Sequence, residues 1–167
     1  MDTSALTGRD PTDCNTLHNS YYIKLSVHGN RALLANETAS PPRKMILTPI
    51  GNAVVAIWQT LSQHFPHIVT DAFYLVPDGI CAIITVDAFS GGEIAVLRML
   101  YRVSSHFKAE TTRVFNNTSS QDYHSRLWQT AFQCEIIGTS AQMTALQERL
   151  AAQGSYRICA FNSLDGK

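Results

Sequence analysis

The sequence IVTDAFYLVPDGICAIITV, residues 68–86, carries the strongest indication of the fold. Two runs rich in apolar and β-branched residues, Ile68–Val76 and Ile80–Val86, flank Pro77-Asp78-Gly79, a triplet typical of a tight turn. The second run is apolar at both odd and even positions, as expected of a strand that is covered on both faces. The stretch therefore predicts a β-hairpin in the middle of a sheet.

A helix is expected on each side of this hairpin along the chain. Before it, Thr48 is a suitable N-cap and Pro49 suits the first helical position, where its missing N–H costs nothing. After it, Ser90 and Glu93 form a capping box at the start of a long helix. Apolar residues then recur at helical spacing, namely Val54, Ile57, Trp58, Leu61 and Phe65 in the first helix and Val96, Leu97, Leu100, Val103, Phe107 and Val114 in the second.

The remaining sequence adds a third helix and further strands. Thr139 and Gln142 predict the cap of a helix that ends at Gly154. Extended segments are expected at Ile23–Val27, Arg31–Asn36, Leu127–Ile137 and Arg157–Phe161. This order predicts an α+β, ferredoxin-like sandwich with helices packed on one face of an antiparallel sheet. We expect residues 1–19, which are polar and rich in turn formers, to be a flexible leader, and residues 20–167 to form one domain.

The composition limits the classes of function. The chain of 167 residues carries 13 basic and 13 acidic side chains, so its overall charge attracts it neither to nucleic acid nor to a membrane, and binding to a polyanion needs a local patch. No apolar run approaches the roughly 18 residues of a membrane span. The widely separated cysteines match no disulfide or zinc pattern and favour a reduced, cytoplasmic protein; they are Cys14, Cys81, Cys134 and Cys159.

Several chemically versatile residues have simpler structural interpretations. His64 and His67 lie at a helix end with no nearby residue to complete a metal site, so a solvated helix terminus is favoured over a metal pair. Trp58 and Trp128 lie in apolar patterns typical of the core. Cys81 lies between apolar residues of a buried strand, where packing is favoured over a role as nucleophile.

The long second helix carries a local excess of positive charge. Only two acidic residues, Glu93 and Glu110, accompany its basic residues in this stretch. Arg98 and Arg102 share a face of the helix because they lie four residues apart. A basic helix of this kind can follow DNA phosphates, and an ordinary solvated helix face is the alternative. The candidate DNA-binding residues are Arg98, Arg102, Lys108 and Arg113, with Arg31 and Arg43 as outlying candidates.

Several segments occur in an order typical of one protein family: Leu47-Thr48-Pro49-Ile50-Gly51, His64-Phe65-Pro66, Asp71 to Pro77, His106 to Arg113 and Trp128-Gln129. Together they resemble the single-tyrosine HUH transposases, in the branch of the insertion-sequence-200-like and REP-associated tyrosine transposases, over about Tyr21 to Gly154. The resemblance implies a ferredoxin-like fold, a homodimer and binding to hairpin or single-stranded DNA. It also implies an ancestral reaction in which DNA is cut and rejoined.

The catalytic residues of that family are replaced in this chain. In the family, two histidines and a third polar ligand hold Mg²⁺ or Mn²⁺ on the scissile phosphate, and a tyrosine attacks it. The resemblance places the histidines at Gly79 and Cys81, the tyrosine at Leu150 and the third ligand at Gly154. Glycine offers no ligand, leucine cannot attack a phosphate, and a thiol suits a hard cation poorly. The sequence therefore predicts no catalytic residue, no metal site and no cofactor.

The preferred hypothesis is a catalytically inactive, transposase-derived domain that binds hairpin or single-stranded DNA as a homodimer and does not interact with membranes. Two alternatives stay open. The low fraction of charged residues, 16%, also suits a homo-oligomeric protein-interaction module without a nucleic-acid role. An active transposase or nuclease would need other ligands and another nucleophile, for which Tyr123, His124 and Tyr156 are the residues to consider.

Overall fold

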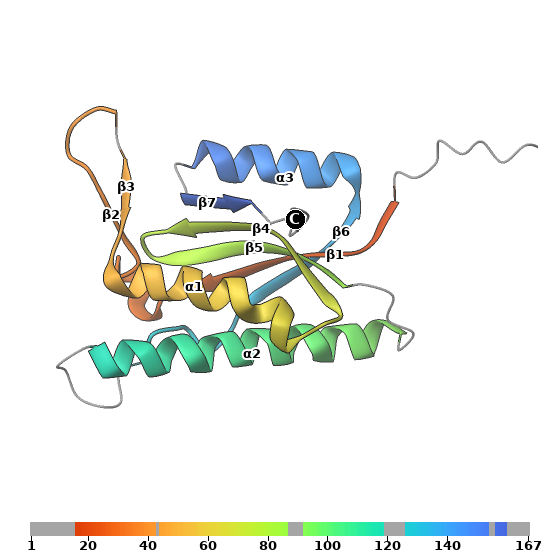
Figure 1. The fold of residues 1–167 in the computed structure, drawn as a ribbon. Helices are drawn as coiled ribbons and strands as arrows, with labels where there is room; N and C mark the ends of the chain where they lie inside the picture. The colour runs from red at the N-terminus through yellow and green to blue at the C-terminus, as the bar shows by residue number, and fades with distance from the viewer. Residues whose placement is uncertain (1–15, 43, 87–91, 119–125, 154–155, 160–167) are drawn as a thin grey trace, which may run out of the picture.

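The computed structural model describes residues 16–42, 44–86, 92–118, 126–153 and 156–159. Within these ranges, helices α1 and α2 lie against one face of a central antiparallel sheet and α3 lies against the other (Figure 1). The sheet and its helices comprise β1 (Thr16–Ser26), α1 (Pro49–His64), β4 (Ile68–Val76), β5 (Gly79–Val86), α2 (Gly92–Thr118), β6 (Gln133–Thr139), α3 (Ser140–Ala152) and β7 (Tyr156–Cys159). A short 3-10 helix, η1 (His28–Asn30), and a separate pair of strands, β2 (Ala35–Glu37) and β3 (Met45–Leu47), join β1 to α1. Among the helices in these ranges, none is long and apolar enough to cross a bilayer.

The expected hairpin forms two interior strands of the central sheet. The described strands follow the order β6-β1-β5-β4-β7, and every neighbouring pair is antiparallel. Strands β4 and β5 pair from Ile68 opposite Val86 to Val76 opposite Gly79. Strand β5 therefore has a partner on each side, in agreement with its apolar sequence.

Side-chain alternation along β1 and β5 builds two apolar layers, one on each face of the sheet. The layer against α1 and α2 includes Ile23, Leu25, Ile80, Ala82, Trp58 and Phe107. The layer against α3 consists of Tyr22, Ala72, Tyr74, Cys81, Ile83, Ile137, Leu146 and Leu150. Because successive residues of a strand point to opposite faces, the same two strands supply both layers.

The caps of two helices agree with the sequence prediction. The Thr48 hydroxyl accepts a hydrogen bond from the Gly51 N–H at 3.0 Å at the start of α1, whose first position is a proline. The Thr139 hydroxyl accepts one from the Gln142 N–H at 3.2 Å at the start of α3. Ser90, the expected cap of the second helix, lies outside the described residues.

The antiparallel α+β architecture is confirmed, and three details differ from expectation. Helix α3 packs on the face opposite α1 and α2, since its leucines meet Tyr22 and Cys81 there, so the helices do not all lie on one face. Strand β1 begins at Thr16, before the expected end of the leader 1–19, because that part of the chain pairs with β6; residues 1–15 lie outside the described ranges. The second strand is Ala35–Glu37, later than expected, because it pairs with β3, a strand that the sequence did not predict.

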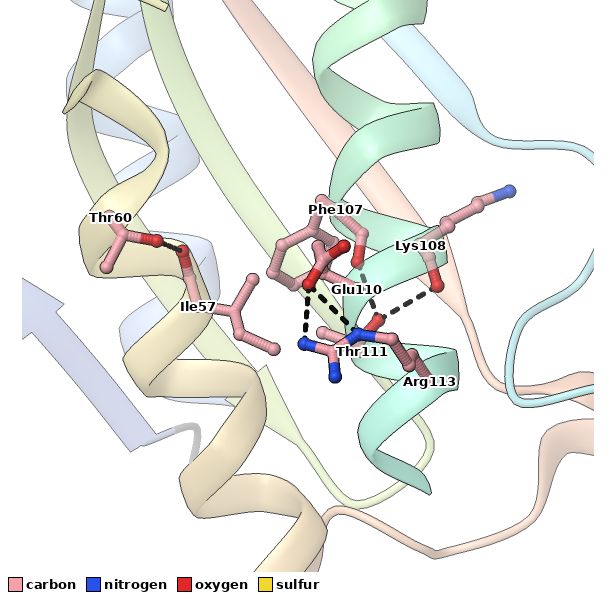
Figure 2. Close-up of polar contacts among 7 residues, drawn as sticks. All are labelled: Ile57, Thr60, Phe107, Lys108, Glu110, Thr111 and Arg113. Carbon is pink, nitrogen blue, oxygen red and sulfur yellow. Dashed lines mark hydrogen bonds and ion pairs between the residues drawn. The ribbon is translucent and has the colours of Figure 1, made fainter. Parts of the chain in front are cut away.

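A row of aromatic side chains connects the sheet to both helices on one face. The ring of Trp58 on α1 lies 4.9 Å from that of Phe73 on β4 and 5.7 Å from that of Phe107 on α2. Phe107 in turn lies 5.8 Å from Trp128, whose indole N–H donates to the Thr111 hydroxyl at 2.7 Å. That hydroxyl donates to the Phe107 carbonyl oxygen at 2.7 Å (Figure 2). Both tryptophans are buried, as the sequence predicts.

Candidate functional site

A pocket of about 710 Å³ lies between the sheet and α3, beside the turn that joins β4 to β5. Residues of β1, β5, β6 and α3 line it. Lys24 of β1 lies opposite Cys81 of β5, and Ser26 lies opposite Gly79, so these four residues belong to one face of the sheet. Leu150 closes the pocket from α3. Packing of α3 on this face therefore brings Leu150 to Gly79 and Cys81 of β5, although about 70 residues separate it from them in the sequence.

Gly79 allows β5 to approach β1 closely. A Cβ atom at this position would lie 2.6 Å from the Leu25 carbonyl oxygen and 3.4 Å from the Cα of Ser26. The first distance is too short for any side chain to be added without separating the strands. Gly79 is not among the described residues with a positive φ, so the requirement for glycine is one of space.

Cys81 takes part in a hydrogen bond at the base of the pocket. The Tyr22 hydroxyl donates to the Cys81 Sγ at 3.1 Å, and both side chains are buried. Burial raises the pKa of the Cys81 thiol and also the pKa of the Tyr22 phenol. Both groups are therefore neutral at pH 7, and neither is an activated nucleophile.

Leu150 contributes apolar surface where the family resemblance places a tyrosine. It is buried and belongs to the same layer as Tyr22, Tyr74 and Cys81. Its neighbour Arg149 also lines the pocket and is exposed. Gly154, the position of the expected third ligand, lies outside the described residues.

Charged residues around the pocket were not predicted from the sequence. Lys24 and Arg149 contribute positive charge, and Asp78 and Glu135 contribute negative charge. Alternation along the first strand would have identified Lys24, because Ile23 and Leu25 on either side of it belong to the opposite, apolar layer. The lining of the pocket therefore carries two positive and two negative side chains.

Three of the predicted DNA-binding residues share a face of α2. At about 100° per residue, Arg102 and Arg113 lie within about 60° of Arg98 around the helix. Arg98 and Arg102 are exposed and form no hydrogen bond or ion pair with the residues that the structure describes. Arg113 pairs with Glu110 at 2.9 Å and lowers the pKa of that carboxyl (Figure 2). Arg98 and Arg102 are thus the more available pair.

Lys108 lies about 80° from Arg98 in the other direction around the helix. Its ammonium donates to the carbonyl oxygens of residues 129, 130 and 131 at 2.7, 3.0 and 3.4 Å, and burial lowers its pKa. Figure 2 shows its side chain pointing away from the Glu110–Arg113 pair. Lys108 therefore stabilises the segment before β6. Of the outlying candidates, Arg31 donates to the carbonyl oxygens of His28 and Arg126, and Arg43 lies outside the described residues.

In sequence, no protein-family model and no curated protein matches the chain. In structure, the chain resembles a REP-associated tyrosine transposase bound to a REP hairpin, with a TM-score of 0.53 and 11% identity over 92% of this chain and 72% of that one. The chain has the transposase fold. A protein from Deinococcus radiodurans, provisionally named a transposase, matches 93% of this chain and 100% of its own, with a TM-score of 0.52 and 10% identity. The resemblance seen in the sequence is thereby confirmed at the level of the fold.

The residues present do not fit the divalent cation that the family resemblance implies. Gly79 has no side chain, and the carbonyl oxygen of Leu25 occupies the space in which one would begin. Cys81 is a neutral thiol that accepts a hydrogen bond from Tyr22. In the part of the chain that the structure describes, no three His, Cys, Asp or Glu side chains gather into a potential metal site. The side chains at positions 79 and 81 therefore offer no pair of ligands for such a cation.

Substituting Gly79→Ala tests the close approach of the two strands. Because the added Cβ meets a backbone oxygen, we expect the free energy of unfolding to fall by about 1–3 kcal/mol, as for other overpacked sites. Gly138→Ala on β6 is the matched control, since its Cβ would lie 3.4 Å from the flexible end of the Gln142 side chain. Urea denaturation compares the two variants. Equal losses of stability would refute the steric role of Gly79.

Proposed function

We propose that the chain is a transposase-derived DNA-binding domain that has lost strand cleavage. One observation carries the proposal. Gly79, Cys81 and Leu150, which the family resemblance aligns with two metal-binding histidines and a nucleophilic tyrosine, line a single pocket in a transposase fold. Such a convergence is expected of an ancestral active site. None of these three residues offers a side chain that can hold a hard cation well or form a phosphotyrosine bond.

Exposed arginines on α2 favour DNA as the partner. The planar guanidinium of arginine pairs with phosphate through two parallel hydrogen bonds. Arg98 and Arg102 have no competing partner among the described residues, and Arg113 lies on the same face. A REP-associated transposase of the same fold was solved with a hairpin, so hairpin and single-stranded DNA are the ligands to test first. The dispersed cysteines are consistent with the reducing cytoplasm.

Removing both arginines should weaken DNA binding and reduce its dependence on salt. Each lost phosphate contact removes about 0.7–0.9 from the slope of log affinity against log salt, so Arg98→Ala/Arg102→Ala should lose about 1.4–1.8. Fluorescence anisotropy with a labelled hairpin oligonucleotide at several salt concentrations measures the slope. Lys44→Ala/Arg126→Ala removes two exposed cations elsewhere and should leave it nearly unchanged. Identical slopes for the two double variants would refute the assignment of the phosphate-binding face.

The wild-type protein should neither cut a hairpin nor become attached to it when Mg²⁺ or Mn²⁺ is added. Labelled oligonucleotides on a denaturing gel test both outcomes, because a phosphotyrosine link survives denaturation. The triple variant Gly79→His/Cys81→His/Leu150→Tyr should also be inactive, since the first substitution places a side chain against the Leu25 carbonyl oxygen. A shifted, covalent product from the wild-type protein would instead support an active enzyme with other catalytic residues.

Exposed apolar side chains favour self-association as a second function. Ile94, Leu97 and Tyr101 lie within about 60° of one another around α2 and are 70%, 46% and 62% exposed. Tyr101 contacts Phe132 at a ring separation of 6.3 Å. Strand β6, the outermost described strand on that side of the sheet, begins next to Phe132. An apolar patch beside an edge strand is typical of a protein interface.

Charge placed in this patch should prevent dimer formation. We expect Leu97→Asp/Tyr101→Asp to sediment as a monomer at concentrations where the wild-type protein sediments as a dimer. Analytical ultracentrifugation measures the two states, and Gln59→Asp/Ser62→Asp, at exposed positions of α1, serves as the control. A wild-type protein that is monomeric throughout would eliminate the homodimer and the interaction-module alternative together.

A further inference from the structure

A second hollow lies between the end of α1 and the first turns of α2. It has a volume of about 380 Å³, at the lower end of the range of about 300–1,000 Å³ for small-ligand sites. Residues 64–67 form one wall, and Ala95, Arg98, Met99 and Arg102 form the other. The polar pocket around Gly79 and Cys81 lies across the sheet, on the face that α3 covers. This α1–α2 hollow is therefore a separate site.

The floor of the α1–α2 hollow is apolar and firmly supported. Phe65 and Met99 are partly buried and pack against the large apolar layer beneath α1 and α2. The Phe65 ring also meets the His106 ring edge-on, with 5.5 Å between the centroids. The Phe65 ring is thus supported by the apolar layer on one side and by the His106 ring on another.

The rim of the α1–α2 hollow is basic. Arg98 and Arg102 stand one helical turn apart on α2, and none of the described lining residues is acidic. The His64 ring is held by contact of its Nδ1 with the Thr60 carbonyl oxygen at 3.0 Å and by the His106 ring at 5.0 Å. The hollow thus combines an apolar aromatic floor with two adjacent positive charges at its edge.

We propose that the α1–α2 hollow binds one unpaired nucleotide of single-stranded DNA. The base lies on Phe65 and Met99, and the neighbouring phosphates are held by Arg98 and Arg102. Proteins that bind single strands combine these two elements, an aromatic platform for the base and a positive groove for the backbone. The inference rests on the proposed DNA binding, and it adds that binding depends on the presence of a base and not on phosphate alone.

The test compares a short single strand of thymidines with an abasic strand of the same length and charge. Wild-type protein should bind the thymidine strand at least about fivefold more tightly, because stacking of one base makes a contribution of that size. Phe65→Leu retains apolar packing but removes the aromatic surface, and it should abolish most of this difference while leaving the salt slope unchanged. Arg98→Ala should reduce the salt slope and leave the preference for the thymidine strand over the abasic strand unchanged. Phe115→Leu, a half-buried ring near the other end of α2, is the matched control.

A second variant makes the test independent of the stability of Phe65→Leu. Ala95→Leu adds apolar volume to the hollow without removing a core side chain, and it should also lower affinity for the thymidine strand alone. Circular dichroism and urea midpoints establish that each variant is folded.

The outcomes separate the two proposals. If the wild-type protein binds neither strand, DNA binding and the nucleotide site both fail. If it binds both strands equally and Arg98→Ala weakens both, DNA binding stands and the nucleotide site is refuted. If polyglutamate competes as well as the thymidine strand and Phe65→Leu has no effect, the hollow is a general anion site and the inference is wrong.

Discussion

Burial of β5 on both faces is the constraint on which the rest of the structure depends. Ile80 and Ile84 point into the layer beneath α1 and α2, and Cys81 and Ile83 point into the layer beneath α3. Each fully buried isoleucine contributes about 1.5–3 kcal/mol to the stability of the fold, so exposing either face of β5 would be strongly destabilising. Because β5 must be covered twice, α3 crosses to the opposite side from the two long helices. That crossing creates the pocket in which Gly79, Cys81 and Leu150 meet.

The distribution of charge gives the two faces different chemical characters. Around the pocket under α3, Lys24 and Arg149 are balanced by Asp78 and Glu135. On α2, one pair of arginines has no counter-charge among the described residues lining the α1–α2 hollow. A chain with no net charge can therefore still present a surface that attracts an anion. This local excess lies on the side of the sheet away from the pocket under α3.

Local patterns predicted much of this fold because they depend on neighbouring residues. The hairpin at 68–86 has the expected strands, and the caps at Thr48 and Thr139 form as expected. The side of the sheet that a helix covers depends on distant partners. The last helix was therefore misplaced: Leu146 and Leu150 give only a short apolar stripe, and either face of the sheet could have accepted it.

The candidate site was also predictable only in part, because local patterns do not show which distant residues meet. The positions of Gly79, Cys81 and Leu150 followed from matching motifs, and their convergence depends on the packing of α3 against this face of the sheet. The engagement of Lys108 with three carbonyl oxygens could not be foreseen, because the segment at 129–131 is brought to the helix by tertiary packing. Likewise, no local pattern places Phe65 beside Arg98, since α1 and α2 meet only in the folded protein.

The close contact between Gly79 and the Leu25 carbonyl oxygen limits which residues this position can accept. Any larger residue, a histidine included, can occupy this point of β5 only if the two backbones move apart. The register of β1 against β5 thus reserves position 79 for glycine, and any chemistry of this pocket has to come from the other residues that line it.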